Sequence, residues 1–194
     1  MSPVNRRQAL RTMAAGTASA LWATHLTAFA QQVADHAHVT AASEGAAFVP
    51  KVLTPQQFRT VGVLVDLILP ATETPGAKAV NVDRYIDVVL RTAPNVDRRR
   101  FLGGLTWLDT RSRALFGKSF VGATPAQQTD VLTRLSGTGG ARPEAPAGVA
   151  FFEAIKGMTI AGYYTTEVGL RQELGDDGRL MLARFEGCTH PEHQ

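Results

Sequence analysis

Apolar residues recur at helical spacing along much of the chain, and two such stretches begin with the same capping pattern. Thr54-Pro55-Gln56-Gln57 and Thr124-Pro125-Ala126-Gln127 each place threonine at the N-cap, proline at the first helical position and glutamine at the third. Apolar residues three and four positions apart follow each pattern. In the first stretch they are Phe58, Val61, Leu64, Val65, Ile68 and Leu69, and in the second Val131, Leu132 and Leu135. The pattern predicts amphipathic helices beginning at Pro55 and Pro125, the first of which ends at Pro70.

Three further helices are predicted from similar signals. Asn81 is a candidate N-cap for a short helix, and Asn95 is one for a longer helix that Gly117 closes. The glycine- and proline-rich residues 136–148 are typical of a surface loop. A final helix is expected from about Val149, with glycines softening its end, and no convincing strand pattern occurs. The sequence therefore predicts an all-α domain of about five helices, with long loops and an irregular tail after Thr165.

The first thirty residues predict an export signal instead of part of the fold. A twin-arginine pair, Arg6 and Arg7, precedes a weakly apolar run over residues 13–29, and a small-residue cleavage site ends at Ala30. The run is too short and too polar to span a membrane, which needs roughly 20 strongly apolar residues. The alternative interpretation is an ordinary amphipathic start to the helical domain. A twin-arginine signal implies export in the folded state, so we expect a periplasmic protein.

This organisation divides the chain into three parts. Residues 1–30 are the expected signal peptide, residues 31–50 a flexible lead-in with little apolar periodicity, and residues 51–194 the helical domain. The leader contains three of the 20 basic residues and no acidic residue, which leaves 17 basic and 17 acidic residues in the mature chain. Nucleic-acid binding depends on clustered lysine and arginine, so this balance does not favour it. Arg98-Arg99-Arg100 remains as a local basic run, interpreted as a solvated first turn of a helix.

No self-sufficient active site is predicted. The carboxylates Asp66, Asp83, Asp87 and Asp109 suggest no acid–base pair, and the paired glycines lack the pattern of a phosphate-binding loop. The aromatic residues are more typical of packing than of cofactor contacts. The sequence therefore predicts no catalytic, cofactor-binding or metal-binding residue in this chain.

The C-terminal residues Cys188, His190 and His193 leave several interpretations open. A thiol beside two imidazoles has the donor atoms of a nucleophile pair or, with Glu192, of a zinc site. However, a terminal tail is a poor platform for a catalytic group, and a solvent-exposed polar terminus is a further interpretation. The only cysteine of an exported chain has no internal mate, so it is either free or paired with another chain. The alternative function is therefore a free-standing periplasmic metal-binding or redox protein that uses this tail.

Three stretches of the sequence form a recognisable combination. They are LILPATETPGA at residues 67–77, AGYYTTEVG at residues 161–169 and EGC at residues 186–188, and they follow a twin-arginine leader. Together they resemble the gluconate 2-dehydrogenase subunit 3 family, which comprises the small subunits of bacterial FAD-dependent sugar and polyol dehydrogenases. Glu73 stands where the family pattern has aspartate. The residues beyond Cys188 are more similar to the small subunits of glucoside 3-dehydrogenases.

The resemblance implies an accessory role. In this family a large subunit, similar to the glucose–methanol–choline oxidoreductases, carries FAD and the catalytic base, and a multihaem cytochrome c often accepts the electrons. The small subunit stabilises the flavoprotein, as a chaperone does, and carries it through the twin-arginine translocon. Tyr163 and Tyr164 are candidate contacts to this partner, with internal packing as the equal alternative. Cys188 is a candidate for a disulfide to the flavoprotein subunit.

Overall fold

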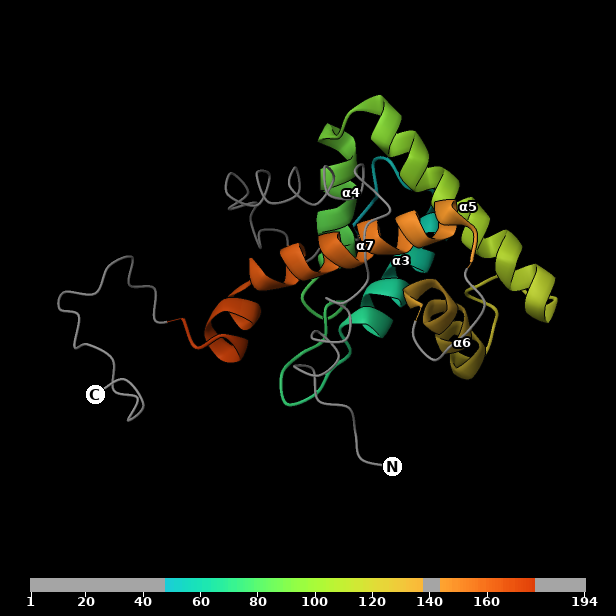
Figure 1. Ribbon diagram of the computed structural model, residues 1–194. Helices are drawn as coiled ribbons and strands as arrows, with labels where there is room; N and C mark the ends of the chain where they lie inside the picture. The colour runs from blue at the N-terminus through green and yellow to red at the C-terminus, as the bar shows by residue number, and fades with distance from the viewer. Residues whose placement is uncertain (1–47, 138–143, 177–194) are drawn as a thin grey trace, which may run out of the picture.

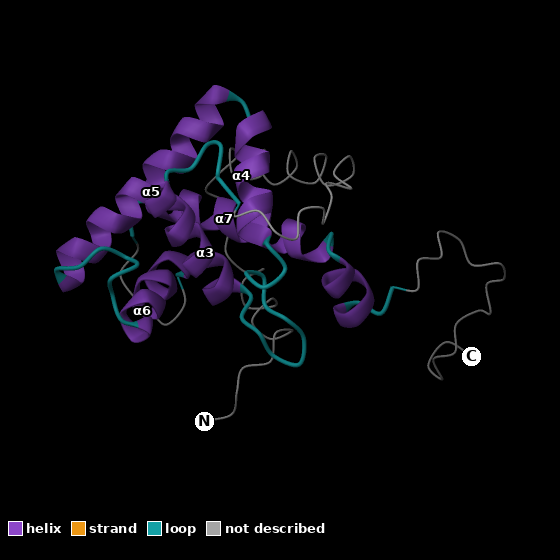
Figure 2. Ribbon diagram, turned by 180° about the vertical axis from the view of Figure 1, so that it is seen from behind, coloured by secondary structure: helices purple, strands orange, loops and turns teal. Residues whose placement is uncertain are grey.

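The computed structural model describes residues 48–137 and 144–176, which form a helical domain without strands in those ranges (Figure 2). The all-α prediction is confirmed. The helices are α3 (Pro55–Ile68), α4 (Val82–Thr92), α5 (Asn95–Phe116), α6 (Pro125–Ser136) and α7 (Pro146–Tyr164), and the π-helical turn η2 (Val168–Glu173) follows. The turn η2 lies in the stretch that was expected to be irregular.

Helix α7 is the centre of the domain. It packs against α3, α4, α5 and α6, and η2 folds back on its C-terminal end (Figure 1). A helix that is surrounded in this way must be apolar on nearly all sides. The sequence of α7 meets this condition, because the side chains of Phe151, Phe152, Ile155, Met158 and Tyr163 are all buried. The core therefore lies along α7, with the other helices around it.

The two predicted capping boxes are confirmed. The Thr54 hydroxyl accepts a hydrogen bond from the Gln57 amide at 3.2 Å, and the Gln57 side-chain oxygen accepts one from the Thr54 amide at 2.9 Å. Thr124 and Gln127 form the same pair of bonds, at 3.4 and 2.9 Å. Gly117 ends α5 with a φ of 70°, a backbone conformation that glycine adopts without steric penalty. These helix ends are therefore decided by residues within one turn of each other.

Other predicted helix ends need correction. Asn81 occupies the N-cap of α4 with a φ of 62°, but its side chain makes no capping hydrogen bond. Asn95 is the first residue of α5, and Pro94 occupies the N-cap. Helix α7 begins at Pro146 instead of Val149, because proline suits the first turn of a helix. The glycines of α7 do not weaken its end: a Cβ on Gly162 would lie 2.5 Å from the Tyr85 ring, so Gly162 lets α4 approach.

A buried carboxylate fixes the start of the described domain to α4. Asp87 accepts hydrogen bonds from the backbone amides of Lys51, Val52 and Leu53, at 2.7, 3.1 and 2.9 Å. The Asp87 side chain is only 1% exposed, so these three amides replace the water that would otherwise solvate the charge. The residues that directly follow the predicted lead-in are thus attached to the helical core before α3 begins.

Candidate functional site

The loop between α3 and α4 contains the first stretch that resembles the family. We call residues 70–76 the latch loop. A backbone hydrogen bond from the Ala77 amide to the Leu69 carbonyl, at 2.9 Å, joins the two residues that flank the loop. A second one, from the Thr72 amide to the Thr74 carbonyl at 3.0 Å, lies within the loop. A Cβ on Gly76 would lie 2.7 Å from the Ala71 amide nitrogen. Glycine is therefore needed here for close approach of the backbone, and its φ is not positive.

Tyr163 connects the latch loop to α7. Its hydroxyl donates a hydrogen bond to the Pro75 carbonyl at 2.9 Å and lies 3.2 Å from the Thr74 hydroxyl. The side chain is fully buried, and its ring packs edge-to-face against Tyr164 at 5.3 Å. Of the two roles that the sequence left open for Tyr163, the structure shows the internal one. Tyr164 is half-buried, so its predicted contact with a partner stays a prediction.

The turn η2 forms the other side of this site. The Thr74 hydroxyl donates a hydrogen bond to the Glu173 carboxylate at 2.7 Å, across 99 residues of sequence. A Cβ on Gly169 would lie only 2.2 Å from the Tyr163 carbonyl oxygen, so Gly169 lets η2 fold against the end of α7. The Thr166 hydroxyl joins η2 to the end of α7. It donates a hydrogen bond to the Tyr163 carbonyl at 2.7 Å and accepts one from the Gly169 amide at 3.1 Å. The two family-like stretches of the described chain thus meet in one place.

The outer surface of this site is exposed although its backbone is fixed. Thr72 and Glu73 are exposed at the tip of the latch loop, and Leu174 at the end of η2 has 61% of its surface exposed. Two prolines, Pro70 and Pro75, further restrict the loop. A fixed, exposed polar loop beside an exposed leucine is suited to binding another protein, because little conformational entropy is lost on association. Glu173 could not be predicted from the sequence, because its hydrogen bond with Thr74 joins segments that are far apart along the chain.

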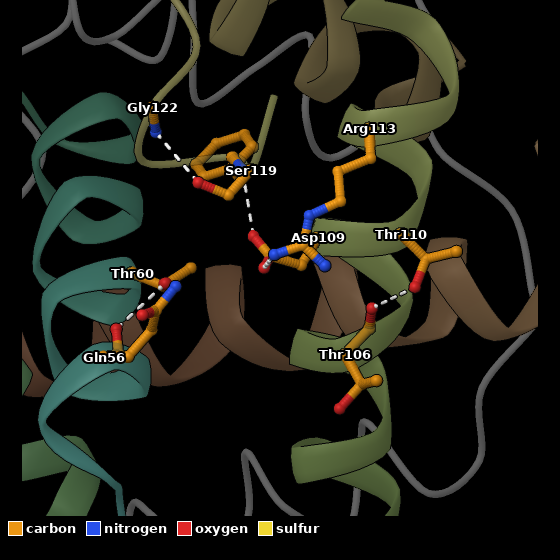
Figure 3. A network of polar contacts seen from close by, with 9 residues as sticks. Gln56, Thr60, Thr106, Asp109, Thr110, Arg113, Ser119 and Gly122 are labelled. Atoms are coloured by element: carbon orange, nitrogen blue, oxygen red, sulfur yellow. Dashed lines mark hydrogen bonds and ion pairs between the residues drawn. The ribbon is translucent and has the colours of Figure 1, made fainter. Parts of the chain in front are cut away.

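The buried carboxylates Asp83 and Asp87 and the half-buried Asp109 have structural partners. Asp87 binds the three backbone amides described above. Asp109 accepts a hydrogen bond from the Phe120 amide at 2.9 Å and pairs with Arg113 at 3.1 Å, which fixes the connection between α5 and α6 (Figure 3). Burial raises the pKa of Asp83, while the Arg84 amide and the Lys78 ammonium group 4.0 Å away act in the opposite direction.

The remaining predicted site residues lie outside the described part of the chain. They are Arg6, Arg7, Ala30, Cys188, His190 and His193. Among the described residues, no group of three histidine, cysteine, aspartate or glutamate side chains is placed to hold a metal ion. The described helices include none with the length and apolar character that a membrane crossing requires.

Comparison with known proteins identifies one family. The family model described as gluconate 2-dehydrogenase subunit 3 matches residues 55–176, which is more than half of the chain. The match begins at the first residue of α3 and ends just beyond η2, so it includes the latch loop and all the described helices. No curated protein and no solved structure shows significant similarity to the chain.

Proposed function

Because the chain belongs to the gluconate 2-dehydrogenase subunit 3 family, we propose that it is the non-catalytic small subunit of a periplasmic FAD-dependent sugar dehydrogenase. It stabilises the flavoprotein subunit and carries it through the twin-arginine translocon. The observation that carries the proposal is the family match across residues 55–176. The structural use of Asp87 and Asp109 supports an accessory role, because these carboxylates are already engaged by backbone amides.

The latch loop is the surface that we assign to the flavoprotein subunit. Glu73 is exposed, and the loop that presents it is held by Tyr163, Thr74 and Glu173. A carboxylate on a rigid loop can accept hydrogen bonds from backbone amides or from a basic side chain of the partner. Leu174 adds an apolar contact at the edge of the same surface. The surface thus has a polar tip at Glu73 and an apolar edge at Leu174.

Co-expression with the flavin-containing dehydrogenase subunit of the same organism tests the assembly. We expect the two chains to elute together, with the flavin absorbance and the sugar-oxidising activity belonging to the partner. We also expect the flavoprotein to lose flavin and to aggregate when this chain is omitted. A stable, active flavoprotein that never associates with this chain would contradict the proposal.

The docking surface has its own test within that complex. Glu73→Lys is expected to weaken the association at least about fivefold, the effect of losing a substantial interface contact. Asp66→Lys, an equal charge reversal at an exposed position of α3, is the matched control and should leave the affinity unchanged. If both variants bind as the wild type does, the latch loop is not the interface, although the complex itself can still form.

Export depends on the leader in this proposal. Replacing Arg6 and Arg7 with lysine should leave both this chain and the flavoprotein in the cytoplasm, which cell fractionation measures. The matched control is Arg11→Lys, outside the arginine pair. A functional export signal on the flavoprotein itself would remove the argument for transport by this chain.

Cys188 is proposed to form a disulfide with the flavoprotein subunit. An exposed free thiol in an oxidising compartment is open to oxidation and mispairing, and the only cysteine of the chain needs a partner from outside. Non-reducing electrophoresis should show a covalent heterodimer that disappears on reduction and in Cys188→Ser. Separate subunits with a titratable thiol would contradict this assignment.

A further inference from the structure

A basic corner lies where α4 passes into α5. It consists of Arg91 in the last turn of α4 and Arg98, Arg99 and Arg100 near the start of α5, with Val96 among them. Arg91, Arg99 and Arg100 are exposed. The corner projects at the top of Figure 1, at the end of α4 opposite to the latch loop. It is therefore separate from the surface assigned to the flavoprotein subunit.

The charge of the basic corner differs from that of the rest of the mature chain. Residues 91–100 contain four arginines and one acidic residue, Asp97. The mature chain beyond the leader has 17 basic and 17 acidic residues, so the remainder has 13 basic and 16 acidic residues. Asp97 lies 3.6 Å from Arg100, and no carboxylate pairs with Arg91 or Arg99 in the described part of the chain. A net positive charge is thus concentrated at one corner.

The stability of α5 does not explain these arginines. The N-terminal end of a helix carries a partial positive charge, so cations near it are unfavourable. Three consecutive arginines nevertheless lie in the first two turns of α5. In the C-terminal half of the same helix, Arg111 pairs with Glu144 at 2.6 Å and Arg113 with Asp109 at 3.1 Å. Arg111 thus reaches another segment of the chain, whereas Arg98 and Arg100 contact Asn95 and Asp97 at the start of α5. Arg91 and Arg99 are exposed.

Val96 adds an apolar element to this corner. It is 44% exposed, and within the described residues it is one of three large apolar side chains with high exposure. Arg99 and Arg100 follow it by three and four residues, so they lie beside it on the surface of α5. Peripheral membrane-binding segments likewise combine apolar side chains with neighbouring cations. The corner offers no exposed aromatic anchor of the kind that dominates many protein interfaces.

We propose that the basic corner contacts the surface of a membrane that contains anionic phospholipid. The arginines attract the phosphate groups, and Val96 enters the boundary between headgroups and acyl chains. A projecting corner needs no complementary cavity on a fluid lipid surface, which favours lipid over an acidic protein. The contact orients the subunit at the membrane, and it does not depend on the proposed assembly with a flavoprotein.

The contact is expected to be weak and sensitive to salt. Each basic residue near an anionic membrane surface strengthens binding about fivefold, and salt screens this attraction over roughly 10 Å. Arg99→Gln and Arg91→Gln should therefore each reduce vesicle binding about fivefold, and the double variant should reduce it about 25-fold. Val96→Ser should give a smaller reduction that salt does not abolish.

Co-sedimentation with vesicles tests the proposal. The chain from Gln31 onward should be used, because Arg6, Arg7 and Arg11 of the leader would themselves bind anionic lipid. We expect binding to vesicles of equal parts phosphatidylglycerol and phosphatidylcholine, and none to phosphatidylcholine alone. Lys118→Gln is the matched control, since Lys118 is exposed just beyond the other end of α5. Circular dichroism of each variant should confirm that the helices are retained.

Three outcomes would overturn the proposal. The first is equal binding to neutral and anionic vesicles. The second is unchanged binding of the Arg91→Gln/Arg99→Gln double variant. The third is a loss of co-purifying flavoprotein in that double variant with vesicle binding retained, which would assign the corner to a protein interface. Failure to form any flavoprotein complex would count against the proposed function and would leave the lipid result to be judged separately.

Discussion

The two halves of α7 are held in different ways. The N-terminal half packs tightly against α5, where Gly104 and Gly148 let rings approach: a Cβ at either position would lie 2.3 Å from the ring of Phe151 or of Trp107. Phe101 and Phe151 are also in ring contact at 5.2 Å. The C-terminal half is held to the latch loop and η2 by hydrogen bonds that centre on Tyr163.

We expect the N-terminal half of α7 to contribute mainly to stability and the C-terminal half mainly to recognition of a partner. Burying aromatic side chains removes a large apolar area from water and contributes most to the free energy of unfolding. A hydrogen bond between neutral groups contributes only about 1 kcal/mol, because water competes for both partners. The bonds around Tyr163 therefore add little stability, but they fix the conformation of an exposed loop. We expect changes in the N-terminal half of α7 to unfold the protein and changes at the latch loop to weaken assembly.

Phe151→Ala should have the largest effect on stability. Phe151 is 1% exposed and packs against Phe101 and Gly104, so its truncation leaves a cavity between α5 and α7. The free energy of unfolding should fall by about 3–5 kcal/mol, measured by denaturant titration. Phe151→Leu, which fills much of the cavity, should cost less and serves if the alanine variant does not fold. A loss below about 1 kcal/mol would contradict the assignment of stability to this half.

Asp87→Ala should have the second-largest effect and lower the free energy of unfolding by about 3 kcal/mol. The substitution leaves the amides of Lys51, Val52 and Leu53 without their acceptor in a buried environment. Comparison with Phe151→Ala shows whether the loss of a buried polar contact lowers the free energy of unfolding as much as the loss of apolar packing does. Asp66→Ala is the control, because Asp66 is exposed on α3 and its loss should change stability by less than about 0.5 kcal/mol. Equal effects of the two variants would show that the Asp87 contacts are not required.

Tyr163→Phe should cost only about 1 kcal/mol of stability but should weaken assembly with the flavoprotein. The variant keeps the buried ring and removes the hydroxyl that binds the Pro75 carbonyl and contacts Thr74. Thermal unfolding measures the first effect, and co-purification measures the second. Val149→Ala, at a half-buried position of the N-terminal half, should show the reverse order, with reduced stability and normal assembly. If Tyr163→Phe assembles as the wild type does, the two halves do not differ in the proposed way.

Asp83→Asn should have the smallest effect, seen mainly in the pH dependence of stability. Burial raises the pKa of Asp83 above its ordinary value of 3.8, so the folded state holds this proton more tightly than the unfolded state does. The Asp83 contribution is then favourable at acid pH and is lost as pH rises through the raised pKa. As the pH rises from the ordinary value of 3.8 through the raised pKa, the melting temperature of the wild type should lose this contribution, whereas that of Asp83→Asn should not. Parallel pH profiles of the two proteins would contradict this sign.

The amino-acid sequence by itself determined the class of fold, the starts of α3 and α6, and the family. The capping boxes at Thr54 and Thr124 could be predicted because every bond in them joins residues three positions apart. The glycine end of α5 is local in the same sense. Export through Arg6 and Arg7 and the disulfide of Cys188 stay predictions that rest on local sequence patterns alone.

Only the tertiary structure decided what the family-like stretches do. The Asp87 carboxylate meets amides 34 to 36 residues earlier in the chain, and Thr74 meets Glu173 across 99 residues. The close approach at Gly76 and the burial of Tyr163 likewise depend on the fold. These contacts form only after the helices have packed around α7, and spacing along the chain carries no information about distances between packed helices.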